Sequence, residues 1–70
     1  MDILINKIYQ HHKGGMYKVI AMAKHTETLE DLVVYQSLYD NKIWCRPLIM
    51  WNENVDFNGK IVKRFQQIKD

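Results

Sequence analysis

The fold is decided by residues 17–50, which read YKVIAMAKHTETLEDLVVYQSLYDNKIWCRPLIM. Two apolar runs, Met16–Lys24 and Leu32–Tyr39, flank a polar connection at residues 25–31, and a short segment ending in Pro47 follows. Both runs suit the period of two residues that β-strands show. A helix competes for the first run, since Ala, Met and Lys favour helices, but the flanking turn residues leave it too short. We therefore predict two long strands.

Alternation assigns the residues of each strand to two faces. In the first strand, one face is uniformly apolar and carries Tyr17, Val19, Ala21 and Ala23. Its other face carries Lys18, Ile20, Met22 and Lys24. In the second strand, Leu32, Val34, Gln36 and Leu38 share one face, and Val33, Tyr35, Ser37 and Tyr39 share the other.

Shorter elements are predicted on both sides of this stretch. Residues 8–12 form a short strand that ends at the Gly14-Gly15 turn, and residues 43–46 form another that Pro47 ends or places at a sheet edge. Residues 48–51 form one turn of helix or a bend. Asn58-Gly59, flanked by residues 55–57 and 60–62, is the strongest short hairpin signal in the chain, and its second arm extends to Phe65.

These elements predict a mainly all-β protein of about five strands with at most one short helical turn. The two expected architectures are a small β-barrel and a rolled antiparallel sheet. With 70 residues, the chain is expected to form a single domain, with residues 1–7 as an N-terminal arm and residues 66–70 as a frayed tail.

Composition restricts the setting in which the protein works. The net charge of +2 is too small to demand nucleic acid as a partner. Cys45 is the one cysteine, so no internal disulfide forms, and a reducing compartment is favoured. No apolar run is long enough to span a membrane. We expect a cytoplasmic protein with no membrane association.

A set of spaced residues resembles a known family. The set comprises Tyr9-x-His11-x-Lys13-Gly14-x-x-Tyr17-x-Val19, Ala23-x-His25-Thr26-Glu27-Thr28-x-Glu30, Val33-Val34-Tyr35-x-x-Leu38-Tyr39 and Trp44-x-Arg46-Pro47-x-x-Met50. It resembles the bacterial and phage family called domain of unknown function 1653, over roughly residues 8–55. The resemblance implies a compact SH3-like β-barrel and no established activity. His12 and Trp51 differ from the residues usual in that family, but both keep a flat ring.

The candidate ligand-binding residues are polar and aromatic side chains near the ends of the predicted strands: His11, Lys13, His25, Glu27, Tyr35, Trp44 and Arg46. Trp44 and Arg46 share one face of a strand that follows Tyr35 across a short turn. Pairing of the two strands would surround a guanidinium with aromatic rings. Such a group suits carboxylates or phosphates, and the rings suit bases.

A purely structural role for the same residues stays open. In that alternative, Arg46 pairs with Glu27 or Glu30, the aromatic rings supply the core, and His25 caps its turn.

The C-terminal part of the chain carries basic residues with one aromatic residue among them: Lys60, Lys63, Arg64 and Lys69, with Phe65. This is the pattern of single-strand binding. A solvated hairpin arm is the favoured interpretation of this group.

Metal, cofactor and catalytic sites are not predicted. His11, His12, His25 and Cys45 lack paired ligand spacing, and neighbouring histidines on a strand point to opposite faces. Cys45 is expected to be a small buried residue rather than a nucleophile. A catalytic pair of Cys45 with His25 is allowed by residue type alone.

Three functional hypotheses follow. The first is a noncatalytic binding module for an anionic or nucleobase-containing ligand, such as a nucleotide or a nucleic-acid end. The second is a protein-interaction domain whose aromatic surface binds a peptide or the edge strand of a partner. The third is a small enzyme that uses His25 and Glu27.

Overall fold

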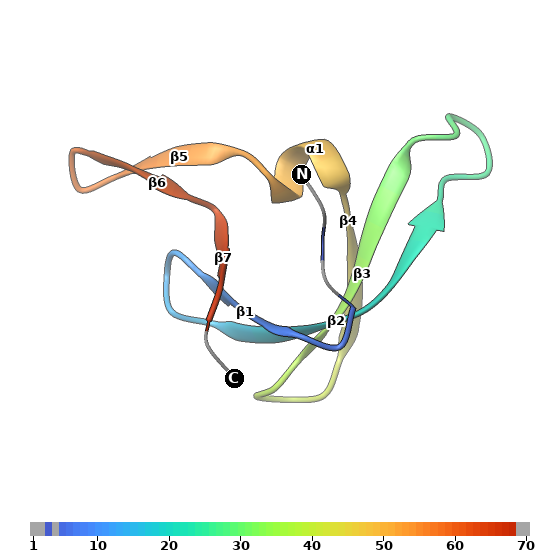
Figure 1. Ribbon diagram of the computed structural model, residues 1–70, viewed down its shortest axis with the longest axis horizontal. Coiled ribbons are helices and arrows are strands. Elements are labelled where there is room, and N and C mark those ends of the chain that lie inside the picture. The colour runs from blue at the N-terminus through green and yellow to red at the C-terminus, as the bar shows by residue number, and fades with distance from the viewer. Residues whose placement is uncertain (1–2, 4, 69–70) are drawn as a thin grey trace.

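The computed structural model describes residue 3 and residues 5–68 of the 70-residue chain. Seven strands and one short helix follow one another (Figure 1): β1 (Ile8–His11), β2 (Met16–Lys24), β3 (Asp31–Ser37), β4 (Ile43–Pro47), α1 (Leu48–Trp51), β5 (Asn54–Phe57), β6 (Lys60–Lys63) and β7 (Phe65–Gln67). The predicted all-β class and the single helical turn are confirmed. No helix in the described part of the chain is long and apolar enough to cross a membrane.

Five of the strands form one antiparallel sheet in the order β4-β3-β2-β1-β7. The sheet is open among the described residues, with β4 and β7 at its edges, and it curves around the space below α1 (Figure 1). A curved open sheet therefore describes the fold, and closure into an SH3-like barrel stays a prediction. We call the face toward α1 the concave face and the opposite face the convex face.

A β-bulge in β2 changes which side chains face inward. Val19 lies opposite Tyr35, but the next pair is Ala21 with Val34, so Ile20 is an extra residue. Beyond the bulge, Met22 lies opposite Val33 on the concave face, and Ala21 and Ala23 turn to the convex face. The prediction that Ala21 and Ala23 share a face with Val19 is therefore wrong. The face assignment predicted for Val33, Tyr35 and Ser37 is confirmed, because all three are buried.

The core lies on the concave face and is largely aromatic. Its buried members are Tyr9, Val19, Val33, Tyr35, Trp51 and Phe65. Trp51, at the end of α1, is 1% exposed and stacks on Phe65 with ring centroids 3.7 Å apart and planes 3° from parallel. Helix α1 thus closes one side of the core with the ring of Trp51.

The C-terminal hairpin forms at the predicted turn and then returns to the main sheet. β5 and β6 pair around Asn58 and Gly59, whose φ angles of 55° and 81° suit this two-residue turn. After a bend at Arg64, β7 pairs with β1, and the amide of Ile68 donates to the carbonyl of Ile8. Residues 66–68 were expected to fray, and this prediction is wrong because their pairing with β1 holds them in the sheet. Residues 69–70 lie outside the described residues.

The N-terminal arm is neither strand nor helix where the structure describes it. Ile3 packs against the core, and the amide of Asn6 donates to the carbonyl of Val19. The remaining residues of the expected arm, 1, 2 and 4, lie outside the description.

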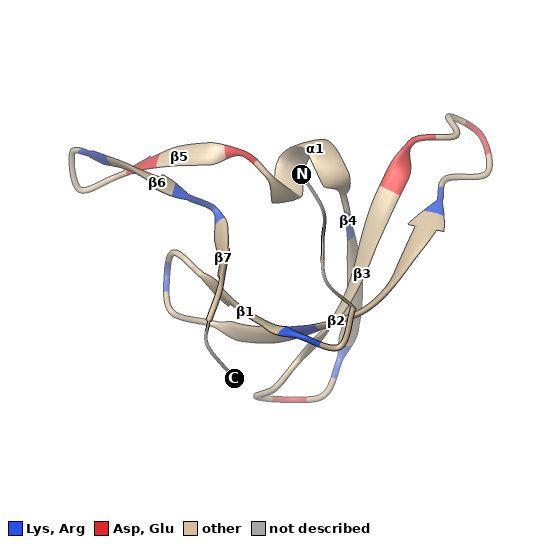
Figure 2. Cartoon of the chain, viewed as in Figure 1, with Lys and Arg blue, Asp and Glu red and all other residues tan. Residues whose placement is uncertain are grey.

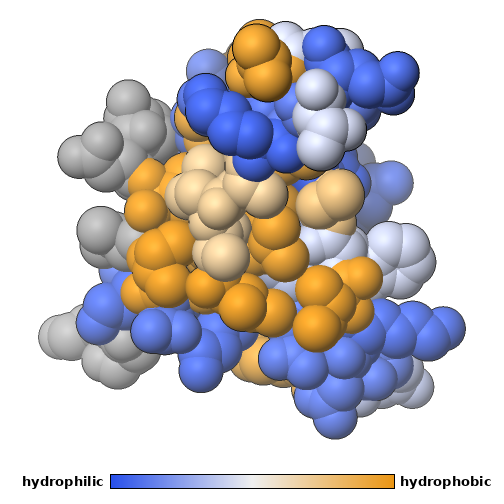
Figure 3. Space-filling model, turned by 90° about the vertical axis from the view of Figure 1, so that its right-hand side faces the viewer, coloured by the Kyte–Doolittle hydropathy of each residue, from blue (hydrophilic) through white to orange (hydrophobic). Residues whose placement is uncertain are grey.

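The convex face of β2, β3 and β4 carries an apolar patch (Figure 3), next to the polar pair Lys18 and Gln36. Strand register places on it Ala21, Ala23, Leu32, Val34, Ile43, Cys45 and Pro47. Cys45 is exposed, so its predicted burial is wrong: the outer side of an edge strand has no second layer to cover it.

Candidate functional site

The pairing of β3 with β4 builds the centre of the candidate site. Tyr35 lies opposite Trp44, and Val33 lies opposite Arg46, so Trp44 and Arg46 share the concave face with Tyr35. Three of the predicted site residues are therefore adjacent. They line a pocket of about 420 Å³, which we call the arginine pocket and whose lining also includes Gly15, Tyr17 and Ser37.

The guanidinium of Arg46 is held from two sides. Its Nε donates a 3.4 Å hydrogen bond to the hydroxyl of Tyr35, and its Cζ lies 5.5 Å from the centroid of the Phe65 ring. No carboxylate forms an ion pair with Arg46 within residues 5–68. The structure therefore does not show the alternative in which Arg46 pairs with Glu27 or Glu30, and no described acid lies within ion-pair distance of Arg46.

The walls of the pocket are aromatic and differ in exposure. Tyr35 is 5% exposed and meets Tyr17 edge to face, with ring centroids 5.2 Å apart. Trp44 is 52% exposed, and Tyr39, which lies beyond the end of β3, is 96% exposed. The inner rings therefore belong to the core, whereas Trp44 and Tyr39 offer free ring surface at the rim.

His11 lies on the same concave face in a positive environment. Its ring meets Phe65 edge to face at 4.9 Å. Burial lowers the pKa of His11 from 6.5 to about 4, and the charges of His12, Arg46, Arg64 and Lys13 act in the same direction. His11 is therefore neutral at pH 7, and cations surround it.

Lys13 and His11 are linked through the backbone of the β1–β2 turn. The amide of Lys13 donates to Nδ1 of His11 over 3.1 Å. The side chain of Lys13 is exposed beside Gly14 and Gly15, close to one end of the arginine pocket. Lys13 thus contributes charge near the pocket without lining it.

His25 and Glu27 lie away from the other predicted residues, in the connection between β2 and β3. Nδ1 of His25 accepts the amides of Glu27 and Thr28, at 3.1 and 3.3 Å. This is the turn-capping role considered as the structural alternative. Figure 2 shows the acidic residues of this connection at the opposite end of the fold from the β1–β2 turn. Neither residue lines the arginine pocket.

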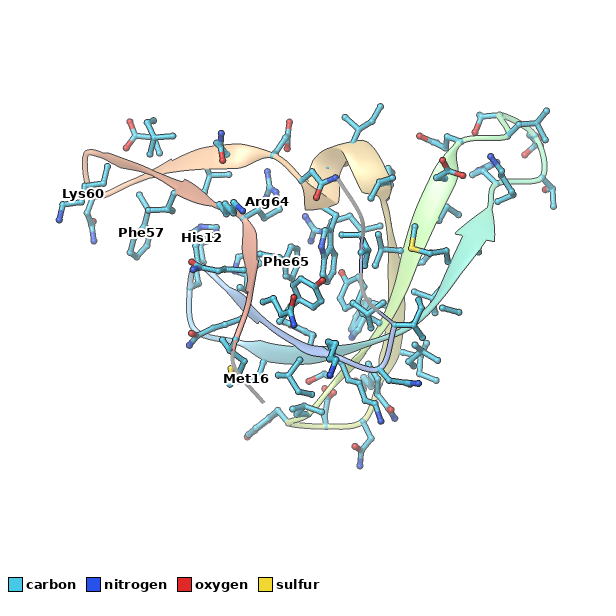
Figure 4. All side chains as sticks on the ribbon, viewed as in Figure 1. His12, Met16, Phe57, Lys60, Arg64 and Phe65 are labelled. Atoms are coloured by element: carbon cyan, nitrogen blue, oxygen red, sulfur yellow. The ribbon has the colours of Figure 1, made fainter. Side chains whose placement is uncertain are left out.

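A second and larger cavity, of about 570 Å³, lies between the hairpin and β1. His12 and Phe57 meet edge to face in its wall, at 5.3 Å (Figure 4). Nδ1 of His12 is buried without a hydrogen-bond partner among the described residues. This cavity contains no arginine in its lining, so it lacks the bidentate group that distinguishes the arginine pocket.

Phe65 does not add an exposed aromatic ring to the basic hairpin arm. Phe65 is 5% exposed because it belongs to the core, and Figure 4 shows it inside the curve of the sheet. Arg64 is bound by Glu53, at 2.8 Å, and by the carbonyl of Met50. Lys60 and Lys63 are exposed. The solvated arm is therefore the better description of these residues.

The histidines and Cys45 do not converge. His11 and His12 have ring centroids 4.2 Å apart, so the expectation that they point to opposite faces is wrong, because β1 ends at His11 and the turn begins at His12. Even so, residue 3 and residues 5–68 contain no group of three or more His, Cys, Asp or Glu that could hold a metal ion.

Sequence reasoning missed several parts of the pocket. Tyr17, Ser37 and Gly15 line it, and Phe65 lies behind Arg46. Alternation had placed Tyr17 on an apolar face and could have identified it. No local signal identifies Phe65, because β7 reaches the site only by pairing with β1.

The fold and the site together define a small antiparallel β domain with one aromatic pocket around an arginine. The chain belongs to the family described as protein of unknown function (DUF1653), whose profile matches residues 7–67. It is similar to a protein of that family from Bordetella bronchiseptica, known from a crystal structure. The two share 34% sequence identity with a TM-score of 0.83, over 93% of this chain and 87% of the other. No curated protein matches the chain.

Proposed function

We propose that this domain is a noncatalytic binding module whose arginine pocket takes a ligand that carries both an anionic group and a planar ring, such as a nucleotide. The observation that supports this most directly is the state of Arg46. The guanidinium is positioned by Tyr35 and Phe65, yet it forms no ion pair with a described carboxylate.

The geometry of Arg46 suits recognition of phosphate or carboxylate. A guanidinium has five N–H donors in a rigid fork. Among the described residues, only the Nε donor has a hydrogen-bond partner, the hydroxyl of Tyr35. The terminal N–H groups are therefore available to two oxygens of one anion, and such bidentate bonds are among the stronger ones in proteins. The cations around His11 add a positive field on the same face.

The rim of the pocket suits a planar ring. Trp44 exposes about half of its surface beside Arg46, so a base can stack on it while its phosphate reaches the guanidinium. Asp40 also lines the pocket and adds a carboxylate acceptor for base or sugar N–H and O–H groups. The volume of about 420 Å³ falls within the usual range for small-molecule sites.

The enzyme hypothesis has less support. His25 and Glu27 lie outside the arginine pocket, and Nδ1 of His25 is occupied by two backbone amides. The geometry therefore favours binding over catalysis by these two residues.

The proposal is tested by following the backbone amides by NMR during titration. The ligands are the four nucleoside monophosphates, their nucleosides, inorganic phosphate and a short single-stranded oligonucleotide. We expect shifts at Gly15, Ser37 and Trp44 with the monophosphates, and weaker binding of the nucleosides and of phosphate alone. Binding should weaken as salt is added.

Two variants complete this test. Arg46→Lys keeps the charge but loses the fork, so nucleotide affinity should fall about tenfold or more. Glu27→Gln, outside the pocket, is the control and should bind as the unchanged protein does. Circular dichroism confirms that both are folded. Equal affinity of the Arg46→Lys variant and the control, or shifts confined to other surfaces, would refute the proposal.

A further inference from the structure

The free edge of β4 has a defined set of hydrogen-bonding groups. The amide of Ser37 donates to the carbonyl of Lys42, and β4 continues in the same antiparallel register with Trp44 opposite Tyr35. Hydrogen-bonded and non-hydrogen-bonded pairs alternate along such a ladder. Trp44 and Arg46 therefore direct their backbone groups toward β3. Ile43, Cys45 and Pro47 direct theirs outward, away from the sheet.

This outward edge is unusual in its exposure of apolar side chains. Ile43 is 62% exposed, Trp44 is 52% exposed, and Cys45 is exposed. Edge strands of monomers are commonly protected by charged residues, proline or coverage by other elements. Among the five residues of β4, only Arg46 and Pro47 are of these protective types. The backbone of Arg46 bonds to β3, so Pro47 alone alters the outward edge, where it removes one N–H.

Two copies of β4 have complementary side chains when they run antiparallel to each other. An antiparallel pair centred on Cys45 places Ile43 opposite Pro47 and Trp44 opposite Arg46. The first pair is apolar on the convex face, and the second sets Trp44 beside Arg46 on the concave face without opposing like charges. Each occurs twice across a two-fold axis. A pair centred on Arg46 would oppose two arginines, and one centred on Trp44 would oppose Arg46 to Lys42. Both are unfavourable.

We propose that β4 is a homodimerisation edge, pairing antiparallel with β4 of a second copy in the register centred on Cys45. The two five-stranded sheets then form one continuous sheet. Four backbone hydrogen bonds join the copies: two between the Cys45 residues, and two from the amide of Ile43 to the carbonyl of Pro47. The apolar patch on the convex face of one copy, seen in Figure 3, would then continue into that of the second copy.

The other edge of the sheet is a poorer candidate. β7 has three residues against five in β4, its Gln66 and Gln67 are polar, and its Phe65 is committed to the core. The longer edge, with apolar and self-complementary side chains, is therefore the one that fits a second copy.

The interface is small, so the dimer is expected to dissociate on dilution. Sedimentation of the full chain over a roughly hundredfold range of concentration should show a monomer–dimer equilibrium. Cys45→Ser should preserve it. Cys45→Lys places two lysines directly opposite each other and should abolish it. The matched control is Ile61→Lys, which adds the same charge at a 70% exposed position in β6 and should leave the dimer intact.

Cross-linking tests the register separately. Cα atoms of a hydrogen-bonded antiparallel pair lie about 5.5 Å apart, within the range that a disulfide spans. With oxidised glutathione as oxidant, Cys45 should link two copies in native buffer and far more slowly in urea. In a Cys45→Ser background, Ile61→Cys should not link the copies at a comparable rate.

Three results would overturn the proposal. They are a wild-type monomer at every concentration, a Cys45→Lys variant that dimerises as well as Ile61→Lys, and native cross-linking no faster than in urea. A negative result here leaves the nucleotide test unaffected, because the residues that line the arginine pocket all belong to one copy of the chain.

Discussion

The Nε of Arg46 donates to the hydroxyl of Tyr35 over 3.4 Å, and Tyr35 itself is 5% exposed. A core residue therefore orients the guanidinium that we propose to bind the ligand. The ring of Tyr35 stabilises the fold while its hydroxyl positions the guanidinium, and these two roles can be separated by removing one oxygen atom.

Tyr35→Phe should keep the fold and lower the free energy of unfolding by about 0.5–1.5 kcal/mol, the usual net value of one hydrogen bond. Nucleotide affinity should fall with it, because Arg46 is no longer held. Tyr39→Phe is the control, since Tyr39 is 96% exposed and the loss of its hydroxyl should not alter stability. Urea unfolding measures both variants. An unchanged affinity in Tyr35→Phe would show that the hydroxyl does not position the arginine.

The two tryptophans should differ sharply in their effect on stability. Trp51 is 1% exposed, so Trp51→Ala should cost about 3–5 kcal/mol. Native proteins have about 5–15 kcal/mol in total, and a 70-residue chain belongs at the low end of that range, so this variant should be partly unfolded at room temperature. Trp44→Ala, at a 52% exposed position, should change stability by about 0.5 kcal/mol or less. Thermal and urea unfolding of both variants give the comparison, and equal losses would contradict the core described above.

His11 should make the fold sensitive to mild acid. Its pKa is lowered to about 4 in the folded protein, below the ordinary 6.5, so the unfolded chain binds the proton more readily between these values. Stability contributed by the neutral ring is present above pH 6.5 and is lost as the pH falls toward 4.

His11→Phe keeps the ring contact with Phe65 and removes the titration. The drop in free energy of unfolding from pH 7 to pH 4.5 should therefore be smaller in this variant than in the unchanged protein. The carboxylates titrate in both proteins and cancel in the comparison. Identical drops would mean that His11 keeps an ordinary pKa.

Arg64 should contribute more to the free energy of unfolding than Lys24, a cation that also forms an ion pair at the surface. It joins the bend before β7 to the end of α1, with Nε bonded to the carbonyl of Met50 and Nη2 to Glu53. Arg64→Ala should cost about 1–3 kcal/mol. Lys24→Ala breaks a 2.7 Å pair with Asp31 whose side chains are 66% and 51% exposed, and should cost under about 1 kcal/mol. Unfolding in urea ranks the two, and a larger loss from Lys24→Ala would contradict this ranking.

Local patterns predicted the parts of the fold that depend on local chemistry. Alternation gave the bounds of β2 as Met16–Lys24, and Asn58-Gly59 gave the hairpin. The bulge at Ile20 was not predictable, because no glycine or proline marks it. It is one inserted residue, and it reverses the facing of every side chain after it in β2.

In the candidate site too, local sequence predicted some of the neighbouring residues and not others. Tyr35, Trp44 and Arg46 come together because one short turn joins their strands, and a residue count across that turn is enough to predict it. His25 and Glu27 do not join them, because strand length along β2 and β3 separates the two ends of the sheet. Phe65 could not be predicted, since its pairing with β1 spans nearly the whole chain.

The late arrival of Phe65 has a consequence for biosynthesis. A ribosome adds about 5–20 residues per second from the N-terminus, so β1 is made first and β7 last. Until Phe65 emerges, Trp51 has no stacking partner and one side of β1 is an unpaired edge. The nascent domain therefore holds an open aromatic half-core while residues 52–65 are added. That interval is when it is most exposed to chaperones and to other nascent chains.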